Sequence, residues 1–134
     1  MDTHLKVVGL LLIVLALLHL IFPKYFNWKQ ELHSLSLVNR QMMYVHTFFI
    51  GFMVFLMGLL CLALPDDLLH TALGKQISLG IGIFWTARLW IQFFVYSSKL
   101  WKGKAFETAV HVLFSVLWTY FSGVFFSVYY FKAL

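Results

Sequence analysis

The chain has 134 residues, of which 62% are apolar and 11% are charged. Ordinary soluble domains have roughly 45–50% apolar and about 25% charged residues. A chain with so few polar side chains cannot cover a water-soluble globule, and we expect lipid to be its solvent. The net charge of +5 comes mainly from basic residues in two short loops. This pattern indicates anionic lipid headgroups as partners and excludes nucleic acid.

The first apolar run covers residues 5–22 and is interrupted only by Lys6 and His19. A run of this length is just long enough to cross a hydrocarbon core of about 30 Å. No small-residue cleavage site follows it, so we expect a retained transmembrane helix and not a signal peptide. Pro23 is predicted to end this helix.

Residues 23–40 are too polar to span a membrane. Apolar residues recur there at helical spacing and predict a short amphipathic helix in the membrane interface: Tyr25, Trp28, Leu32 and Leu35. Asn27 followed by Gln30 resembles a capping box at its start, while Glu31 and Ser34 fall on its polar side. We expect this helix to lie over the bundle as a lid.

The second predicted span covers residues 41–64 and ends at Pro65, which an acidic pair follows. Gly51 and Gly58 lie two helical turns apart on one face of this span. Because glycine has no side chain, a neighbouring helix can approach closely there. Cys61, the single cysteine, is predicted to be a small buried apolar residue, and it excludes an internal disulfide.

The third span covers residues 77–96, with Arg88 near its middle, and the fourth covers residues 108–131. The sequence contains no linker or second domain, so we predict one transmembrane domain over residues 1–134. The fold class is an all-α integral membrane protein, a four-helix bundle with up-down-up-down topology and an interfacial helix between the first two spans.

The positions of the basic residues predict the orientation. Six of the ten flank the connections between spans one and two and between spans three and four: Lys24, Lys29, Arg40, Lys99, Lys102 and Lys104. The termini and the remaining loop carry only three, which three aspartates offset: Lys6, Lys75 and Lys132, against Asp2, Asp66 and Asp67. The positive-inside rule therefore predicts a cytoplasmic (inner) membrane with both termini outside.

Three histidines are predicted to lie at similar depth near the cytoplasmic end of such a bundle: His19, His46 and His111. Spans two and four are diagonal in a simple bundle, so we expect His46 and His111 to face each other across its centre. Gln92 is expected at nearly the same level, with Arg88 one turn deeper.

Polar residues form a stripe at helical spacing on each of the last two spans. On the third span these are Ser78, Trp85, Arg88, Gln92 and Tyr96; on the fourth they are Thr108, His111, Ser115, Trp118 and Ser122. Lipid cannot satisfy their hydrogen bonds, so both stripes are predicted to turn inward.

Inserting Arg88 into the membrane costs more free energy than inserting any other member of the stripes, ~2.5–3.5 kcal/mol on insertion scales. No span has an acidic residue in its interior, so Arg88 needs carbonyl groups, a surface carboxylate (Glu31 or Glu107) or a bound anion.

The first functional hypothesis is a haem or metal protein, with a role in redox chemistry. Haem b would be held between His46 and His111, with Arg88 and Gln92 beside it, because neutral histidine is the commonest metal ligand. A non-haem site would hold a single metal ion, Fe or Zn, through His19, His46 and His111, with Glu31 or Gln92 as a fourth ligand or general base.

Two alternatives come from other classes of protein. In one, Arg88 and Gln92 bind or transport an anionic lipid-like molecule. In the other, the chain is a structural subunit whose polar stripes pair with a partner protein or with a second copy. The sequence contains none of the usual catalytic motifs, and it leaves enzymatic activity open.

Overall fold

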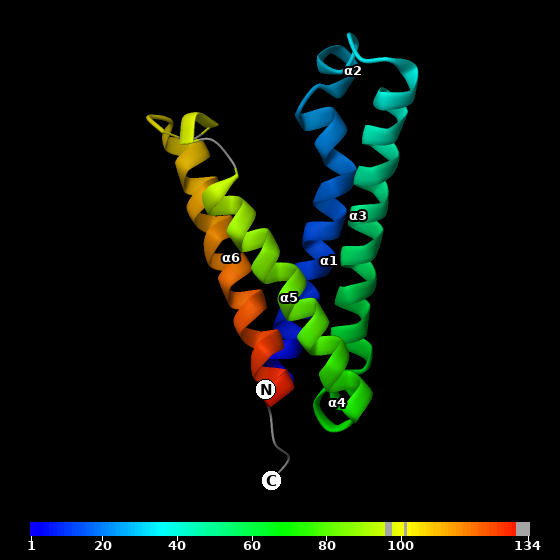
Figure 1. Cartoon of the computed structure of the whole chain (residues 1–134), viewed down its shortest axis with the longest axis vertical. Coiled ribbons are helices and arrows are strands. Elements are labelled where there is room, and N and C mark those ends of the chain that lie inside the picture. The colour runs from blue at the N-terminus through cyan, green and yellow to red at the C-terminus, as the bar shows by residue number, and fades with distance from the viewer. Residues whose placement is uncertain (96–97, 101, 131–134) are drawn as a thin grey trace. The chain divides into compact units, whose positions relative to one another are not determined.

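A computed structural model describes residues 1–95, 98–100 and 102–130 of the chain. The described part is helical and contains no strand. Its elements are α1 (Asp2–Tyr25), α2 (Trp28–Glu31), α3 (Leu37–Ala63), α4 (Pro65–His70), α5 (Ala72–Phe94), the 3-10 turn η1 (Ser98–Leu100) and α6 (Ala105–Tyr130) (Figure 1). The predicted ends of spans three and four, Tyr96 and Phe131, lie outside the described residues.

The four long helices α1, α3, α5 and α6 are each long and apolar enough to cross a membrane. The predicted helical class and the four apolar helices are therefore confirmed. The predicted end of the first helix at Pro23 is wrong, because α1 continues to Tyr25. The missing N–H of Pro23 does not end the helix, and just after α1 the Phe26 N–H still donates to the Phe22 carbonyl four residues back, at 2.9 Å.

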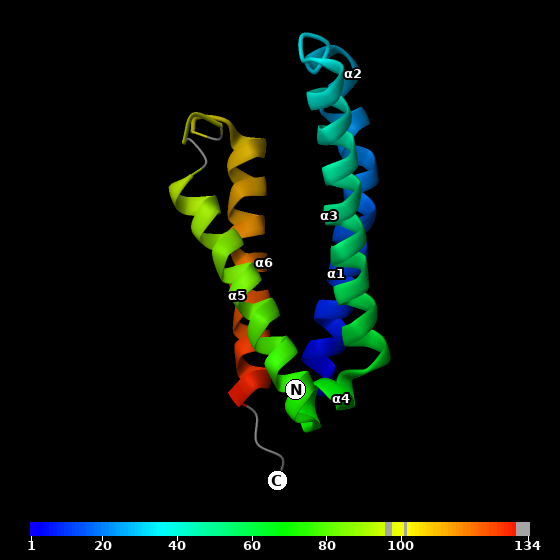
Figure 2. The ribbon, with the colours of Figure 1, turned by 45° about the vertical axis from the view of Figure 1, so that its right-hand side comes forward.

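One compact unit, Thr3–Pro65, contains the antiparallel pair α1 and α3 (Figures 1 and 2). The two backbones meet at Gly9 and Gly58: a Cβ atom on Gly58 would lie 2.8 Å from the Gly9 carbonyl oxygen. Towards the other end, a Cβ atom on Gly51 would lie 2.9 Å from the Cβ of His19. The predicted close approach at Gly51 and Gly58 is confirmed, and the predicted burial of Cys61 is confirmed as well.

The connection between α1 and α3 differs from the predicted amphipathic helix. Its helical part, α2, is a single turn, and Asn27 before it has a positive φ of 54° and makes no side-chain capping bond. The Asn27 side-chain amide instead donates to Gln30 Oε1 at 2.9 Å. The turn ends because the N–H groups of His33 and Leu35 bond to carbonyls three residues back. Ser36 then caps α3, its hydroxyl accepting from the Asn39 N–H.

The other compact unit contains α4, α5 and α6. Sequence reasoning missed α4, which Pro65 opens at its first position, where a missing N–H costs nothing. Thr71 links α4 to α5: its hydroxyl accepts from the Gly74 N–H at 2.9 Å and donates to the Asp67 carbonyl at 2.6 Å. α5 and α6 are antiparallel. The four-helix bundle, and one domain over residues 1–134, stay predictions.

Candidate functional site

The two polar stripes of the last two helices face each other across the α5–α6 hairpin. We call the eight residues involved the α5–α6 seam: Ser78, Trp85, Arg88, Gln92, His111, Ser115, Trp118 and Ser122. The rings of Trp85 and Trp118 stack at its centre, with centroids 4.9 Å apart and planes 18° apart. The predicted inward turn of both stripes is therefore found within this hairpin. Tyr96 of the predicted stripe lies outside the described residues.

Gln92 and His111 form the hydrogen-bonded end of the seam. Gln92 is only 8% exposed, and its Nε2 lies 3.0 Å from His111 Nδ1 and 3.4 Å from the His111 carbonyl oxygen. A carbonyl oxygen only accepts, so Nε2 is the donor in that bond. With the amide in this orientation Nε2 also donates to Nδ1, and the neutral imidazole of His111 then carries its proton on its own Nε2.

Arg88, one helical turn before Gln92 on α5, lies over an aromatic ring. Its guanidinium carbon is 5.7 Å from the ring centroid of Trp118, a cation–π distance. Phe114 stacks on the same indole, with centroids 5.3 Å apart. Sequence reasoning placed Arg88 and Trp118 on facing stripes but missed this contact, although an arginine and a tryptophan on facing stripes are a signal for it.

Four buried polar atoms of the seam have no hydrogen-bond partner among the described residues: Ser78 Oγ, Trp85 Nε1, Trp118 Nε1 and Ser122 Oγ. Three other hydroxyls of the same two helices, those of Thr86, Ser115 and Thr119, each donate at 2.8 Å to the carbonyl four residues back. The orphaned groups therefore contrast with the usual behaviour of hydroxyls in this hairpin. An unsatisfied buried donor costs about 1–3 kcal/mol.

The seam is rich in donors and poor in negative charge. Indole N–H and guanidinium groups donate only, and α5 contains no acidic residue. The one acidic residue of α6, Glu107, lies in its first turn. An arrangement of this kind is complementary to a group with several acceptor oxygens, such as a carboxylate or a phosphate.

The histidine cluster predicted from the sequence is not supported. Among the residues that the structure describes, no group of three or more His, Cys, Asp or Glu side chains could hold a metal ion. His46 and Glu31 are exposed on α3 and α2, whereas His19 is half-buried against Gly51. His46 precedes Gly51 by five residues, so it points about 140° around α3 from the face that contacts α1. Similar depth in a bundle does not put side chains on the same face.

His19 is oriented by its own helix. Its Nδ1 lies 2.9 Å from the Leu15 carbonyl oxygen, so this nitrogen donates, and in the neutral ring Nε2 is the acceptor. The tautomer is the opposite of the one that Gln92 imposes on His111.

The fold and the site define the chain as an all-helical protein with four apolar helices long enough to span a membrane, and with a polar seam between the last two. No protein-family model, curated protein or solved structure matches it. Its function is therefore argued from the chemistry of the site.

Proposed function

We propose that the protein is an integral membrane protein that binds an anionic, lipid-like ligand at the α5–α6 seam. The observation that carries this proposal is the set of buried donors along the seam that have no partner among the described residues, at Trp85, Trp118, Ser78 and Ser122, together with the cation of Arg88 over the Trp118 ring. The distribution of basic residues supports an inner membrane with both termini outside.

Arg88 is the residue that binds the acidic group of the ligand. A guanidinium presents a planar fork that suits the two oxygens of a carboxylate or phosphate. The indole N–H groups of Trp85 and Trp118 supply further donors along the same seam. Because the membrane interior has a low dielectric constant, each donor gains more from an acceptor there than it would in water.

Gln92 has an indirect role in this proposal. Both hydrogens of its amide nitrogen are directed to His111, so they are not available to an anion. The direct contact predicted from the sequence is therefore replaced by a positioning role, in which Gln92 fixes the tautomer of His111.

The test is to identify what the protein retains when it is purified in a neutral detergent. We expect mass spectrometry of an extract to find an anionic amphiphile in about equimolar amount. Trp118→Phe removes one donor, keeps the ring and should lower retention. Its matched control, Trp90→Phe, changes an exposed tryptophan outside the seam and should retain the ligand. Wild-type protein without any stoichiometric anionic amphiphile would contradict the proposal.

The second candidate function is binding of haem b or of a single Fe or Zn ion, and the tautomer of His19 favours it. A donated Nδ1–H leaves Nε2 as the basic nitrogen, which is the state of most metal-ligating histidines. In this candidate function His19 is a metal ligand. His111 can be a ligand only if Gln92 reorients, because both of its ring nitrogens are otherwise occupied, Nδ1 by the Gln92 amide and Nε2 by the proton. His46 is not a second ligand on this hairpin, because its side chain is exposed and points about 140° around α3 from the face against which His19 lies.

A visible spectrum and an elemental analysis of protein purified without a polyhistidine tag test this candidate. His19→Ala should release the group and His70→Ala, on α4, should not. Protein that is both colourless and free of stoichiometric metal would rule the candidate out and leave the anionic ligand as the function.

A further inference from the structure

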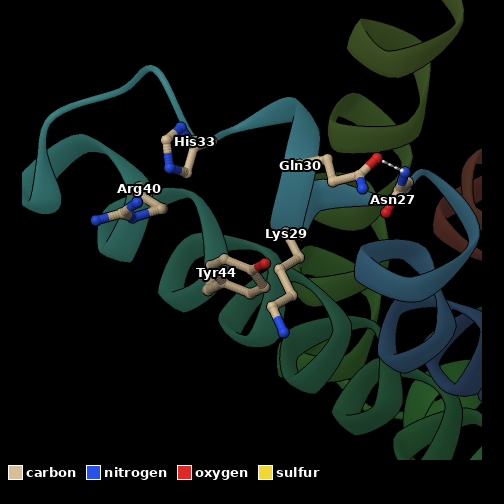
Figure 3. Close-up of a pocket in the computed structure, with 6 residues that line it drawn as sticks. All are labelled: Asn27, Lys29, Gln30, His33, Arg40 and Tyr44. Atoms are coloured by element: carbon tan, nitrogen blue, oxygen red, sulfur yellow. Dashed lines mark hydrogen bonds between the residues drawn. The ribbon is translucent and has the colours of Figure 1, made fainter.

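A second polar site lies on the α1–α3 hairpin and shares no residue with the α5–α6 seam. It is an open pocket of about 730 Å³ between the α2 turn and the first turns of α3 (Figure 3). Its lining residues are polar or basic: Asn27, Lys29, Gln30, His33, Arg40 and Tyr44. The volume falls within the range of about 300–1,000 Å³ that is typical of ligand pockets.

The walls of this pocket are held in place by the local structure. Trp28 of α2 is buried and packs edge-on against Tyr44 of α3, with ring centroids 5.5 Å apart. This contact packs the α2 turn against α3. The hydrogen bond from Asn27 to Gln30 closes the turn on the other side. Arg40 precedes Tyr44 by one turn of α3, so both line the pocket from the same helix face.

The pocket carries positive charge and no acidic lining residue. Lys29, His33 and Arg40 approach it from two elements, and Figure 3 shows His33 beside Arg40 and Lys29 beside Tyr44. None of these three side chains forms an ion pair within the described part of the chain. Arg40 is half-buried, while Lys29 and His33 are exposed.

We propose that this pocket binds the phosphate group of an anionic phospholipid headgroup. The Arg40 guanidinium can hold two phosphate oxygens, and Lys29 adds a point charge on a flexible stem. The amide groups and the Tyr44 hydroxyl are neutral partners for the remaining oxygens. The shared chemistry is that of any phosphate ester.

The neighbouring residues favour a lipid over a soluble phosphate. Tyr25 and Phe26, at the end of α1 next to the pocket, are 64% and 51% exposed. Exposed aromatic residues at the end of an apolar helix are typical of the level of the headgroups in a membrane. A phosphate bound beside them would therefore belong to a molecule whose chains enter the membrane along α1 and α3.

The experiment measures binding of fluorescently labelled phosphatidic acid to the full chain in micelles of a neutral detergent. Lys29→Gln/Arg40→Gln removes two charges from the pocket and should weaken binding by about tenfold or more, because two charge-assisted hydrogen bonds to the phosphate are lost. Each single substitution should cause a smaller loss than the double substitution. The matched control, Lys102→Gln/Lys104→Gln, removes two exposed charges from the other hairpin and should change binding by less than about twofold.

Three results would overturn the proposal. Equal losses in the pocket variant and the control would mean nonspecific attraction to positive charge. Unchanged binding in the pocket variant would place the phosphate elsewhere. If glycerol phosphate competes at the same concentration as unlabelled phosphatidic acid, the pocket binds soluble phosphate esters. The proposal that the phosphate belongs to a lipid would then be wrong. Loss of the anionic amphiphile from the α5–α6 seam would leave this result unaffected, because the two sites share no residue.

Discussion

Gln92 on α5 and His111 on α6 are joined through a 3.0 Å contact between Gln92 Nε2 and His111 Nδ1. This pair links the two helices by side-chain hydrogen bonding at one end of the seam, and stacked tryptophans link them at its centre. The pair has two separable roles, since it stabilises the hairpin and also sets which imidazole nitrogen carries the proton.

The stabilising role is tested by a double-mutant cycle with Gln92→Leu and His111→Leu. Hydrogen bonds between membrane helices measured in this way average about 0.6 kcal/mol, with a maximum of about 1.7 kcal/mol, and we expect a coupling free energy in this range. The measurement is the free energy of unfolding in mixed micelles. A control cycle pairs Gln92→Leu with Thr119→Val, because Thr119 bonds within its own helix, and it should give no coupling. Zero coupling in both cycles would contradict the link.

Arg88→Leu should make α5 easier to insert by about 2.5–3.5 kcal/mol, the cost of a charge at mid-depth. The same change should abolish retention of the anionic ligand. Arg88→Lys keeps the charge but loses the fork, and we expect it to impair retention too. A glycosylation-based insertion assay measures the first effect and mass spectrometry the second. If Arg88→Leu protein is stable and retains the ligand fully, Arg88 is not part of the site.

The close approach of α1 and α3 predicts opposite outcomes for two glycine substitutions. Gly58→Ala places a Cβ atom 2.8 Å from the Gly9 carbonyl oxygen, and such overpacking costs about 1–3 kcal/mol. Gly80→Ala meets no atom within 4 Å and should be neutral or stabilise α5 by up to about 1 kcal/mol. Unfolding in mixed micelles, followed by circular dichroism, compares the two. Equal stability of both variants would show that the helices do not meet at Gly58.

The orientation is tested by adding a tag to each terminus and measuring its accessibility in intact cells. We expect both termini outside, because six of the ten basic residues flank the two connections predicted to be cytoplasmic. Moving charges is the complementary experiment: Lys99→Gln, Lys102→Gln and Lys104→Gln together should weaken the bias. Termini that are accessible only after the cells are opened would overturn the orientation.

Apolar runs predicted the four long helices because length and composition are sufficient to recognise such segments. The facing stripes of α5 and α6 could also be predicted, since buried polar residues at helical spacing must turn towards one another. The ends of the helices were predicted less accurately than the helices themselves. Pro23 lies inside α1, and α3, capped by Ser36, begins at Leu37, four residues before the predicted start at Gln41. Local caps and backbone bonds decide these positions.

The histidine site could not be predicted from depth alone. His46 has the expected level along α3, but its side chain is exposed, because five residues of helix separate it by about 140° from the face that Gly51 presents to α1. The cation–π contact of Arg88 with Trp118 was missed for a related reason. Spacing gives the face of a helix, whereas the neighbour of a side chain depends on the register between two helices, and here the register follows from the stacking of Trp85 on Trp118.

The meeting of α1 and α3 at Gly9 and Gly58 has a consequence for synthesis. All of these contacts lie within Thr3–Pro65, so they can form while the rest of the chain is still in the ribosome. Chains generally fold from the N-terminal side during synthesis. A ribosome stalled after α3 has entered the membrane should already display a closed hairpin, which crosslinking between cysteines introduced in α1 and α3 would detect.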